Sequence, residues 1–217
     1  MNTEPIKQSV QAAASRKRIG VFGGAFDPPH NAHIALAKAA LEQFELDALF
    51  VIPTGHAWHK ARALSAPEHR LAMTRLAFEN VPGVVVDERE LQRVGPTFTI
   101  DTLQALQDEN PQAQLYLFIG ADQFSSFRQW HKWQEILELA IICIADRAPS
   151  TLTQAQFDTY AAHKQRFFTL QLPLMAVSAT QIRQLMVLGA VSACDVAQLV
   201  PEAVASYISS HRLYRSR

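Results

Sequence analysis

Two histidines three residues apart lie in the segment Gly23-Gly24-Ala25-Phe26-Asp27-Pro28-Pro29-His30-Asn31-Ala32-His33. The apolar run before this segment predicts a buried strand, and the residues from about Asn31 onward predict a helix. Paired glycines let backbone N–H groups approach a ligand closely. A helix start favours anions, because its N–H groups are unpaired and the positive end of the helix dipole lies there. We therefore expect a phosphate site here, with His30 and His33 as hydrogen-bond donors.

This segment does not match other common phosphate or metal motifs. It contains neither a Gly-x-Gly-x-x-Gly dinucleotide fingerprint nor a Walker loop. A zinc site needs at least a third ligand and usually a glutamate general base, and neither is evident beside His30 and His33. We therefore assign no metal ligands. The alternative interpretation is that both histidines are ordinary polar residues at a helix start.

A second candidate, Ser178-Ala179-Thr180-Gln181-Ile182-Arg183, lies near the end of the chain. It places a hydroxyl at a predicted helix start and an arginine one turn later. Taken alone, Ser178 or Thr180 could be a plain helix cap and Arg183 a solvated surface charge. Taken with the histidine segment, two positive helix ends, a guanidinium and two imidazoles could surround a triphosphate.

Short apolar runs alternate with longer helical patterns along the chain. They predict strands at 18–22, 48–52, 84–87, 115–119, 140–145 and 167–170, helices beginning near residues 31, 67, 99 and 122, and a mainly helical C-terminal third. The alternation predicts an α/β fold. It is a Rossmann-like, doubly wound, mostly parallel sheet with helices on both faces and a helical C-terminal segment. Because such sheets bind ligands at the carboxyl ends of their strands, we expect the site there.

Size and composition limit the classes of protein that fit. The 217 residues predict one domain over residues 18–217, preceded by a flexible N-terminal tail at 1–17 that lacks the apolar stretch of a secretory signal. Twenty basic and twenty acidic residues cancel, which argues against a nucleic-acid partner. No apolar run is long enough to span a bilayer, and Cys143 and Cys194 are interpreted as thiols in a reducing compartment. A cytoplasmic protein without a membrane partner is expected, and a homo-oligomer stays open.

The two motifs make the chain resemble the HxGH nucleotidyltransferase superfamily. Its marks are a His-x-x-His segment after the first strand and a Ser-Ser-Thr-x-x-Arg-like segment near the end, here residues 30–33 and 178–183. Within it, the chain is most similar to bacterial nicotinate-nucleotide adenylyltransferase. The resemblance extends from Arg18 to Tyr214 and includes segments 53–60, 97–103 and 120–122, followed by Trp130 and Trp133.

The resemblance implies a reaction and a set of site residues. The reaction is adenylyl transfer from ATP, accompanied by Mg²⁺, to nicotinate mononucleotide (NaMN), which gives nicotinic acid adenine dinucleotide (NaAD) and pyrophosphate. The implied catalytic residues are His30, His33, Lys60 and Arg183. The implied ATP-binding residues are Gly23, Gly24, Ala25, Phe26, His33, Gly120, Asp122, Ser178, Thr180 and Arg183. The implied NaMN-binding residues are His59, Lys60, Phe98, Thr99, Trp130 and His131.

Several of these assignments have alternatives. Lys60 could be a solvated loop lysine, Asp122 could only cap a helix, and Trp130 and Trp133, three apart on a predicted helix, could both be core residues. Asp27 is interpreted as orienting the histidine segment. The whole chain could also be another adenylyl- or cytidylyltransferase of the superfamily, such as a pantetheine-phosphate adenylyltransferase, or a non-catalytic nucleotide-binding protein. The presence of His30, His33, Lys60 and Arg183 favours an enzyme.

Overall fold

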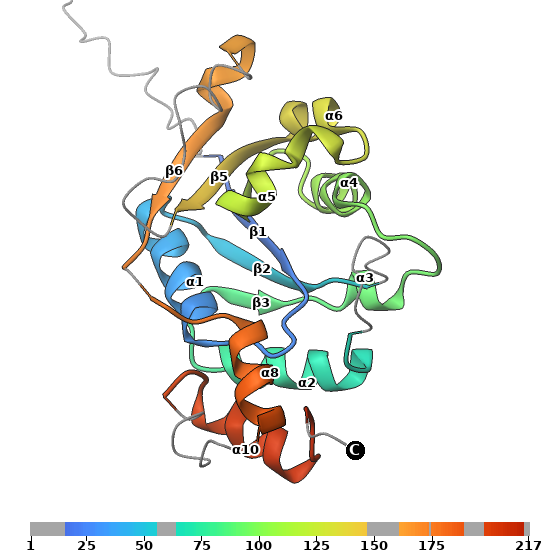
Figure 1. The fold of residues 1–217 in the computed structure, drawn as a ribbon. Helices are drawn as coiled ribbons and strands as arrows, with labels where there is room; N and C mark the ends of the chain where they lie inside the picture. The colour runs from blue at the N-terminus through green and yellow to red at the C-terminus, as the bar shows by residue number, and fades with distance from the viewer. Residues whose placement is uncertain (1–15, 56–63, 147–160, 174, 189–197, 215–217) are drawn as a thin grey trace, which may run out of the picture.

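The computed structural model describes residues 16–55, 64–146, 161–173, 175–188 and 198–214. Six strands form one sheet in the order β3-β2-β1-β4-β5-β6 (Figure 1). Their bounds are β1 Arg18–Gly24, β2 Ala48–Pro53, β3 Val84–Val86, β4 Gln114–Gly120, β5 Ala140–Asp146 and β6 Phe167–Gln171. Every neighbouring pair is parallel, so the predicted parallel sheet is confirmed.

The central strands are buried on both faces, and their alternating side chains enter two different cores. In β5, Ile142 and Ile144 pack in one core, whereas Cys143 and Ala145 pack in the other. Side chains alternate because successive residues of a strand point to opposite faces. The predicted covering of both faces by helices is therefore confirmed, and it accounts for the nearly continuous apolar sequence of these strands.

Two groups of helices complete these cores (Figure 1). The core that holds Cys143 is closed by α1 (Asn31–Gln43), α2 (Pro67–Phe78), α8 (Ala179–Leu188) and α10 (Glu202–Ser210). The core that holds Ile142 is closed by α4 (Thr99–Glu109), α5 (Ala121–Ser125) and α6 (Trp133–Leu139). The short helix α3 (Arg89–Gln92) and the 3-10 turns η1 (Phe127–Gln129) and η2 (Ala161–Arg166) lie between these elements.

The strand order reverses between β1 and β4. From β1 the chain builds outward through β2 to β3, and then returns to place β4 on the other side of β1. The segments that follow β1 and β4 therefore leave the sheet side by side at its carboxyl edge. Such a switch point is where doubly wound sheets bind their ligands, so the topology brings the glycine-histidine segment and the Gly120-Ala121-Asp122 segment to one place.

A helix does begin near residue 122, as predicted, but it is too short to hold Trp130 and Trp133, so their predicted placement on one helix is wrong. Helix α5 ends at Ser125, η1 follows, and α6 begins only at Trp133, after Lys132 in the left-handed region at φ 55°. The Ser125 and Ser126 hydroxyls donate to carbonyls one turn earlier, which competes with continued helix. Trp130 therefore lies before α6 and does not share a helix with Trp133.

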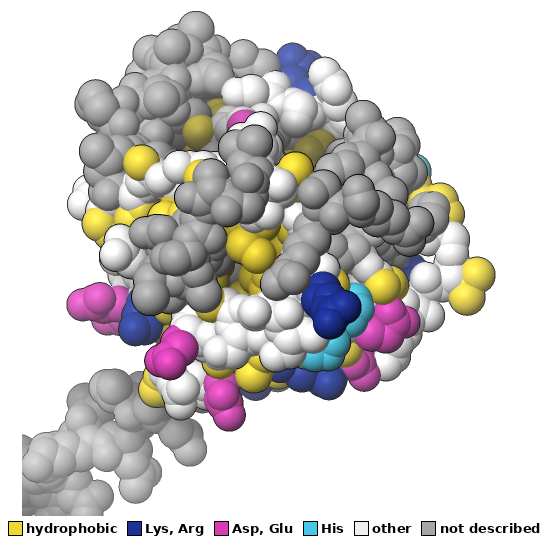
Figure 2. Space-filling model, turned by 60° about the horizontal axis from the view of Figure 1, so that its bottom comes forward, with side chains coloured by type: hydrophobic (Ala, Val, Ile, Leu, Met, Phe, Trp, Pro, Cys, Tyr) yellow, Lys and Arg dark blue, Asp and Glu magenta, His cyan; other side chains and the backbone are white. Residues whose placement is uncertain are grey.

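The surface carries both signs of charge. On the face in Figure 2, basic, acidic and histidine side chains lie near one another around a central hydrophobic area. This mixture matches the zero net charge of the sequence. Within the described ranges, no helix combines the length and apolar character that crossing a membrane requires. The predicted tail at 1–17 falls almost wholly outside the described residues.

Candidate active site

Two cavities meet at the carboxyl edge of the sheet. The first, which we name the α1-side pocket, has a volume of about 820 Å³ and is lined by residues at the starts of α1 and α8. The second, the α4-side pocket, has a volume of about 530 Å³ and is lined by residues at the start of α4 and between α5 and α6. Both volumes are in the range of small-molecule sites.

The structure sorts the predicted site residues between these pockets. Those predicted for ATP line the α1-side pocket together with His30: Gly23, Gly24, Ala25, Phe26, His33, Gly120, Asp122, Ser178, Thr180 and Arg183. The predicted NaMN residues Phe98, Thr99, Trp130 and His131 line the α4-side pocket. His59 and Lys60 lie outside the described residues.

The two pockets share part of their lining. Gly23, Gly24 and Ala25, at the end of β1 and just after it, contribute to both, as do Asp122 and Gln123 of α5. A Cβ on Gly23 would have no heavy atom within 4 Å, so the missing side chain leaves open space where the pockets meet. Ligands in the two pockets can therefore meet at the end of β1.

His30 and His33 lie at the first turn of α1 in different structural roles. His30 is the residue before the helix and is only 2% exposed, whereas His33 is in its first turn and half-buried. The His30 backbone N–H donates to His33 Nδ1 at 3.1 Å, and the two rings stack with centroids 3.6 Å apart. Because Nδ1 accepts this bond, the proton of a neutral His33 ring is on Nε2, which can donate to a ligand.

Arg183 is tied to the loop after β1. Its Nη1 donates to the main-chain oxygen of Asp27 at 2.7 Å, and its Nη2 donates to Thr180 Oγ1 at 3.0 Å. The interpretation of Arg183 as a solvated surface charge is therefore wrong. Ser178 does cap α8, since its hydroxyl accepts from the Gln181 N–H at 3.2 Å, and it also lines the pocket. Capping and ligand contact are compatible at this position.

A cluster of buried polar side chains, Asp27 and Arg70 among them, holds the loop after β1 in place. The Asp27 carboxylate, 1% exposed, accepts from the Tyr214 hydroxyl at 2.6 Å and from the Ser65 N–H at 3.2 Å. Arg70, 2% exposed, donates to the main-chain oxygens of Ala25, Thr54 and Ser65. Burial lowers the pKa of the Arg70 guanidinium, while the nearby Asp27 charge opposes this shift. The orienting interpretation of Asp27 agrees with these contacts.

The α4-side pocket combines a helix start with aromatic rings. Phe98 precedes α4 and Thr99 begins it, so the unpaired N–H groups of this helix lie at the pocket wall. The Phe98 and His131 rings pack 4.4 Å apart, and Trp130 packs on Phe127 at 5.4 Å. Both Trp130 and Trp133 pack against the core that holds Ile142, but of the two only Trp130 lines the pocket.

Asp122 does not cap α5. Gly120 is the residue before that helix, and its N–H is bonded by Gln123 Oε1 at 3.3 Å, so the capping alternative for Asp122 is wrong. Asp122 is exposed and lines both pockets. A carboxylate there can accept hydrogen bonds from sugar hydroxyls.

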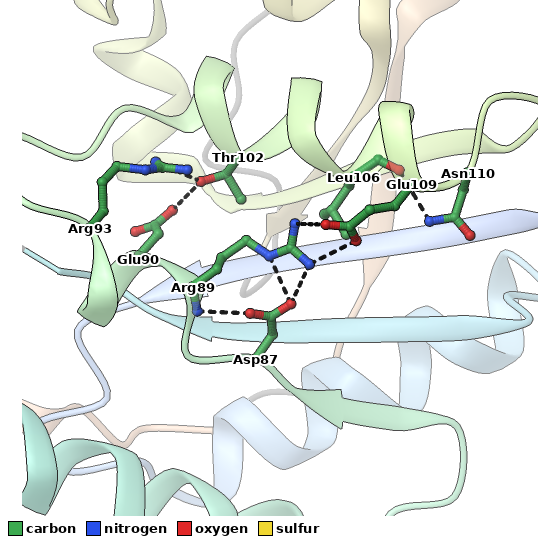
Figure 3. Close-up of polar contacts among 8 residues, drawn as sticks. All are labelled: Asp87, Arg89, Glu90, Arg93, Thr102, Leu106, Glu109 and Asn110. Carbon is green, nitrogen blue, oxygen red and sulfur yellow. Dashed lines mark hydrogen bonds and ion pairs between the residues drawn. The ribbon is translucent and has the colours of Figure 1, made fainter.

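Glu90 is a pocket residue that no sequence motif indicated. This carboxylate is 8% exposed, lines the α4-side pocket and accepts from the Thr102 hydroxyl at 2.8 Å and the Thr54 hydroxyl at 3.1 Å. Figure 3 shows it beside Thr102 and Arg93. Burial raises the pKa of Glu90 and outweighs the hydrogen bonds from Thr102 and Thr54. An acidic residue in the charged stretch 87–93 looks like a surface residue, so only the folded structure distinguishes it.

The neighbouring charges in Figure 3 fix α3 to α4. Arg89 donates to Asp87 Oδ2 at 2.7 Å and to both carboxylate oxygens of Glu109 at 3.0 Å. These bonds join the end of β3 to the far end of α4, and Glu90 joins α3 to its near end. Polar contacts therefore hold α4, whose start borders the α4-side pocket, near both of its ends, at Thr102 and at Glu109.

Comparison with known proteins agrees with this geometry. The cytidylyltransferase-like family model matches residues 21–185. Two solved structures of Plasmodium falciparum nicotinic acid mononucleotide adenylyltransferase, one complexed with NaAD and one with APC, align with TM-scores of 0.75 and 0.74. Each alignment covers 92% of this chain and 98% of the other at 17% identity, which shows the shared fold.

Closer relatives are known by sequence. A probable nicotinate-nucleotide adenylyltransferase of Bordetella petrii is 40% identical, over 92% of this chain and 100% of the relative. One of Albidiferax ferrireducens is 54% identical, over 92% of this chain and 99% of the relative. Identity of this extent along nearly the full length of both chains shows that this chain belongs to the nicotinate-nucleotide adenylyltransferase family.

Proposed function

We propose that the chain transfers an adenylyl group from ATP to NaMN, giving NaAD and pyrophosphate, a step of NAD biosynthesis. The observation that carries this proposal is the shared lining of two pockets at Gly23, Gly24 and Ala25. A transfer between two nucleotides needs two adjoining sites whose reacting phosphates meet. Membership of the family supports this reaction, and the two adjoining pockets can hold its two nucleotide substrates.

The reaction needs no protein nucleophile. A phosphate oxygen of NaMN attacks the α-phosphorus of ATP, a new P–O bond forms, and the bond to the pyrophosphate oxygen breaks. Because the attacking oxygen is already anionic, the protein must align the phosphates and stabilise the charge that develops on them. We assign the α1-side pocket to ATP and the α4-side pocket to NaMN.

Three donors in the α1-side pocket suit the phosphates of ATP. His33 presents Nε2–H, Arg183 presents a guanidinium fixed by Asp27, and the start of α8 after Ser178 presents backbone N–H groups. His30, the residue before α1, lines the same pocket and is proposed as a further donor to the phosphates. Lys60, with His59, is proposed to contact phosphate from the segment after β2, on the strength of the family resemblance alone. Asp122 is proposed to accept hydrogen bonds from a ribose, and the lack of a side chain at Gly120 is proposed to let the backbone approach that sugar.

Magnesium is proposed to enter as part of the ATP complex. Among the described residues, no group of three or more His, Cys, Asp or Glu side chains is arranged to hold a metal ion. Mg²⁺ commonly keeps several waters and is held through substrate phosphates. We therefore propose that the ion contacts the phosphates of ATP and water, and we assign it no ligand among the described residues.

The start of α4 is proposed to recognise the nicotinate carboxylate. The backbone N–H groups near Phe98, Thr99 and His131 can donate to an anion, and the positive end of the α4 dipole favours one. Trp130 is proposed as the platform for the pyridine ring, because aromatic rings stack favourably on indole. A neutral amide in place of the carboxylate loses the charge-assisted hydrogen bonds and is expected to bind about tenfold or more weakly.

One assay of the purified chain tests the proposal. With ATP, Mg²⁺ and NaMN, we expect pyrophosphate and NaAD in equal amounts, and a lower kcat/KM with nicotinamide mononucleotide. Parallel reactions with 4′-phosphopantetheine as acceptor, and with CTP as donor, represent the other superfamily reactions. Preferred use of either alternative, or nucleotide binding without turnover of any pair, would overturn the proposed function. Equal use of the amide would overturn only the role given to the start of α4.

A further inference from the structure

The last described residue of the chain reaches the loop of the first motif. Tyr214 follows α10, and its hydroxyl donates to Asp27 Oδ1 at 2.6 Å. The same hydroxyl lies 3.9 Å from Met73 Sδ on α2. The tyrosine therefore lies between α2 and the loop after β1, two segments that are far from it in sequence.

Asp27 connects this tyrosine to Arg183. One carboxylate oxygen of Asp27 accepts from Tyr214 and the other from the Ser65 N–H, while its main-chain oxygen accepts from Arg183 Nη1 at 2.7 Å. The side chain of Asp27 is thus held on both oxygens, and its main chain holds the guanidinium. A shift of the carboxylate would move the carbonyl group that orients Arg183.

Hydrogen bonding and burial both favour a fixed contact between the Tyr214 hydroxyl and the Asp27 carboxylate. A hydrogen bond from a hydroxyl to a carboxylate is among the stronger ones in proteins, and a buried carboxylate that loses a donor bears the cost of desolvation. Burial raises the pKa of the Tyr214 hydroxyl, as does the Asp27 charge. The hydroxyl therefore keeps its proton at ordinary pH and acts as the donor.

We propose that Tyr214 is a positioning residue of the active site, which acts through Asp27 to hold Arg183 against the phosphates of ATP. This inference rests on the proposed function for the identity of the ligand. Asp27 and Arg183 are among the described residues around the α1-side pocket and not among those around the α4-side pocket. The hydroxyl of Tyr214 should therefore affect the use of ATP and leave the use of NaMN nearly unchanged.

The direct test is Tyr214→Phe, which removes one oxygen and keeps the ring. We expect kcat/KM for ATP to fall about tenfold, the size of a lost hydrogen bond to a charged group, and KM for NaMN to stay within about twofold. In an Arg183→Ala background, the same change should lower kcat/KM for ATP by less than about twofold, because its effect passes through Arg183.

The matched control is Tyr207→Phe. Tyr207 is on α10, and its hydroxyl lies 2.9 Å from His69 Nδ1 on α2, so its loss weakens the packing of the C-terminal helix without touching Asp27. We expect wild-type parameters for both substrates. If both phenylalanine variants change the ATP parameters equally, or if Tyr214→Phe raises KM for both substrates in parallel, the role of Tyr214 is structural and the inference is wrong.

Binding of a non-hydrolysable ATP analogue, measured by calorimetry without acceptor, separates this inference from the proposed function. About tenfold weaker binding by Tyr214→Phe, with unchanged binding by Tyr207→Phe, supports the inference even if NaMN proves to be the wrong acceptor. Wild-type binding together with wild-type turnover in Tyr214→Phe overturns it while the proposed function stands.

Discussion

At the scale of single residues, one hydrogen bond within the histidine pair supports the donor role that we propose for His33. The His30 N–H donates to His33 Nδ1, so in a neutral ring the proton of His33 is on Nε2. His33 also packs edge-on against Phe26, with ring centroids 5.1 Å apart, which limits the orientations of the imidazole. A donor held in one orientation stabilises developing charge more effectively than a mobile one, because it needs no reorganisation during the reaction.

Replacement of His33 tests this role. We expect His33→Ala to lower kcat by about 10²–10³-fold, the typical effect of removing one preorganised donor, while the unfolding midpoint stays well above the assay temperature. Steady-state kinetics with thermal unfolding by circular dichroism measures both quantities. His163→Ala, at an exposed position of η2, is the control and should retain activity. A loss of less than about threefold in His33→Ala would contradict a catalytic role for the imidazole.

At the scale of elements, the pockets depend on how closely neighbouring segments approach. Gly55 follows β2, and a Cβ there would lie 2.1 Å from the main-chain oxygen of Glu90. Glycine therefore allows the end of β2 to contact α3, and the bond from the Thr54 hydroxyl to Glu90 holds the two together. The absence of a side chain at Gly23 has another effect, because it leaves space between the pockets.

Two glycine-to-alanine variants distinguish these effects. Gly55→Ala must displace backbone, so we expect it to destabilise the fold by about 1–3 kcal/mol, or about 2–4 °C in Tm per kcal/mol for a chain of this size. Gly23→Ala should keep the wild-type Tm but lower kcat/KM about tenfold or more, because its methyl group enters the shared space. Calorimetric unfolding and steady-state kinetics of both variants provide the comparison. Reversed outcomes would show that the two glycines have been assigned to the wrong roles.

At the scale of the whole molecule, two cores support the site at the carboxyl edge of the sheet, and buried polar groups make stability depend on pH. Glu90 is the clearest case, because burial raises its pKa in the folded chain above the value of an exposed glutamate. Below the unfolded pKa both states are protonated and there is no penalty. As the pH rises through the folded pKa, the folded state must ionise a buried group, and stability falls.

Glu90→Gln removes this ionisation and tests the dependence. We expect the free energy of unfolding of Glu90→Gln, relative to wild type, to rise as the pH increases from the unfolded pKa to above the folded pKa, and then to stay level. Urea unfolding at a series of pH values measures the difference. Thr102→Val removes a hydrogen bond that favours the ionised form, so it should extend the window to higher pH. A difference that increases toward low pH would contradict the assignment.

The sequence by itself determined the parallel sheet and indicated two candidate phosphate motifs. Buried parallel strands need continuous apolar runs and their crossovers need helices, so both periodicities are visible in the chain. Motifs such as residues 30–33 and 178–183 are also local, because a helix start makes its anion site from consecutive backbone N–H groups. The oligomeric state, the location in the cell and the absence of a nucleic-acid partner stay predictions.

Only the tertiary structure decided which residues from distant segments act together. It separated the predicted residues into two pockets, placed Trp130 before α6, bonded Arg183 to Asp27, buried Glu90 and brought the half-buried Tyr214 onto Asp27. Burial and contacts between distant segments depend on the strand order, which places β4 beside β1. No local pattern of residues encodes that order. The type of a charged or hydroxyl residue does not tell whether its side chain lies on the surface or in a buried cluster, because that depends on its neighbours in the folded chain.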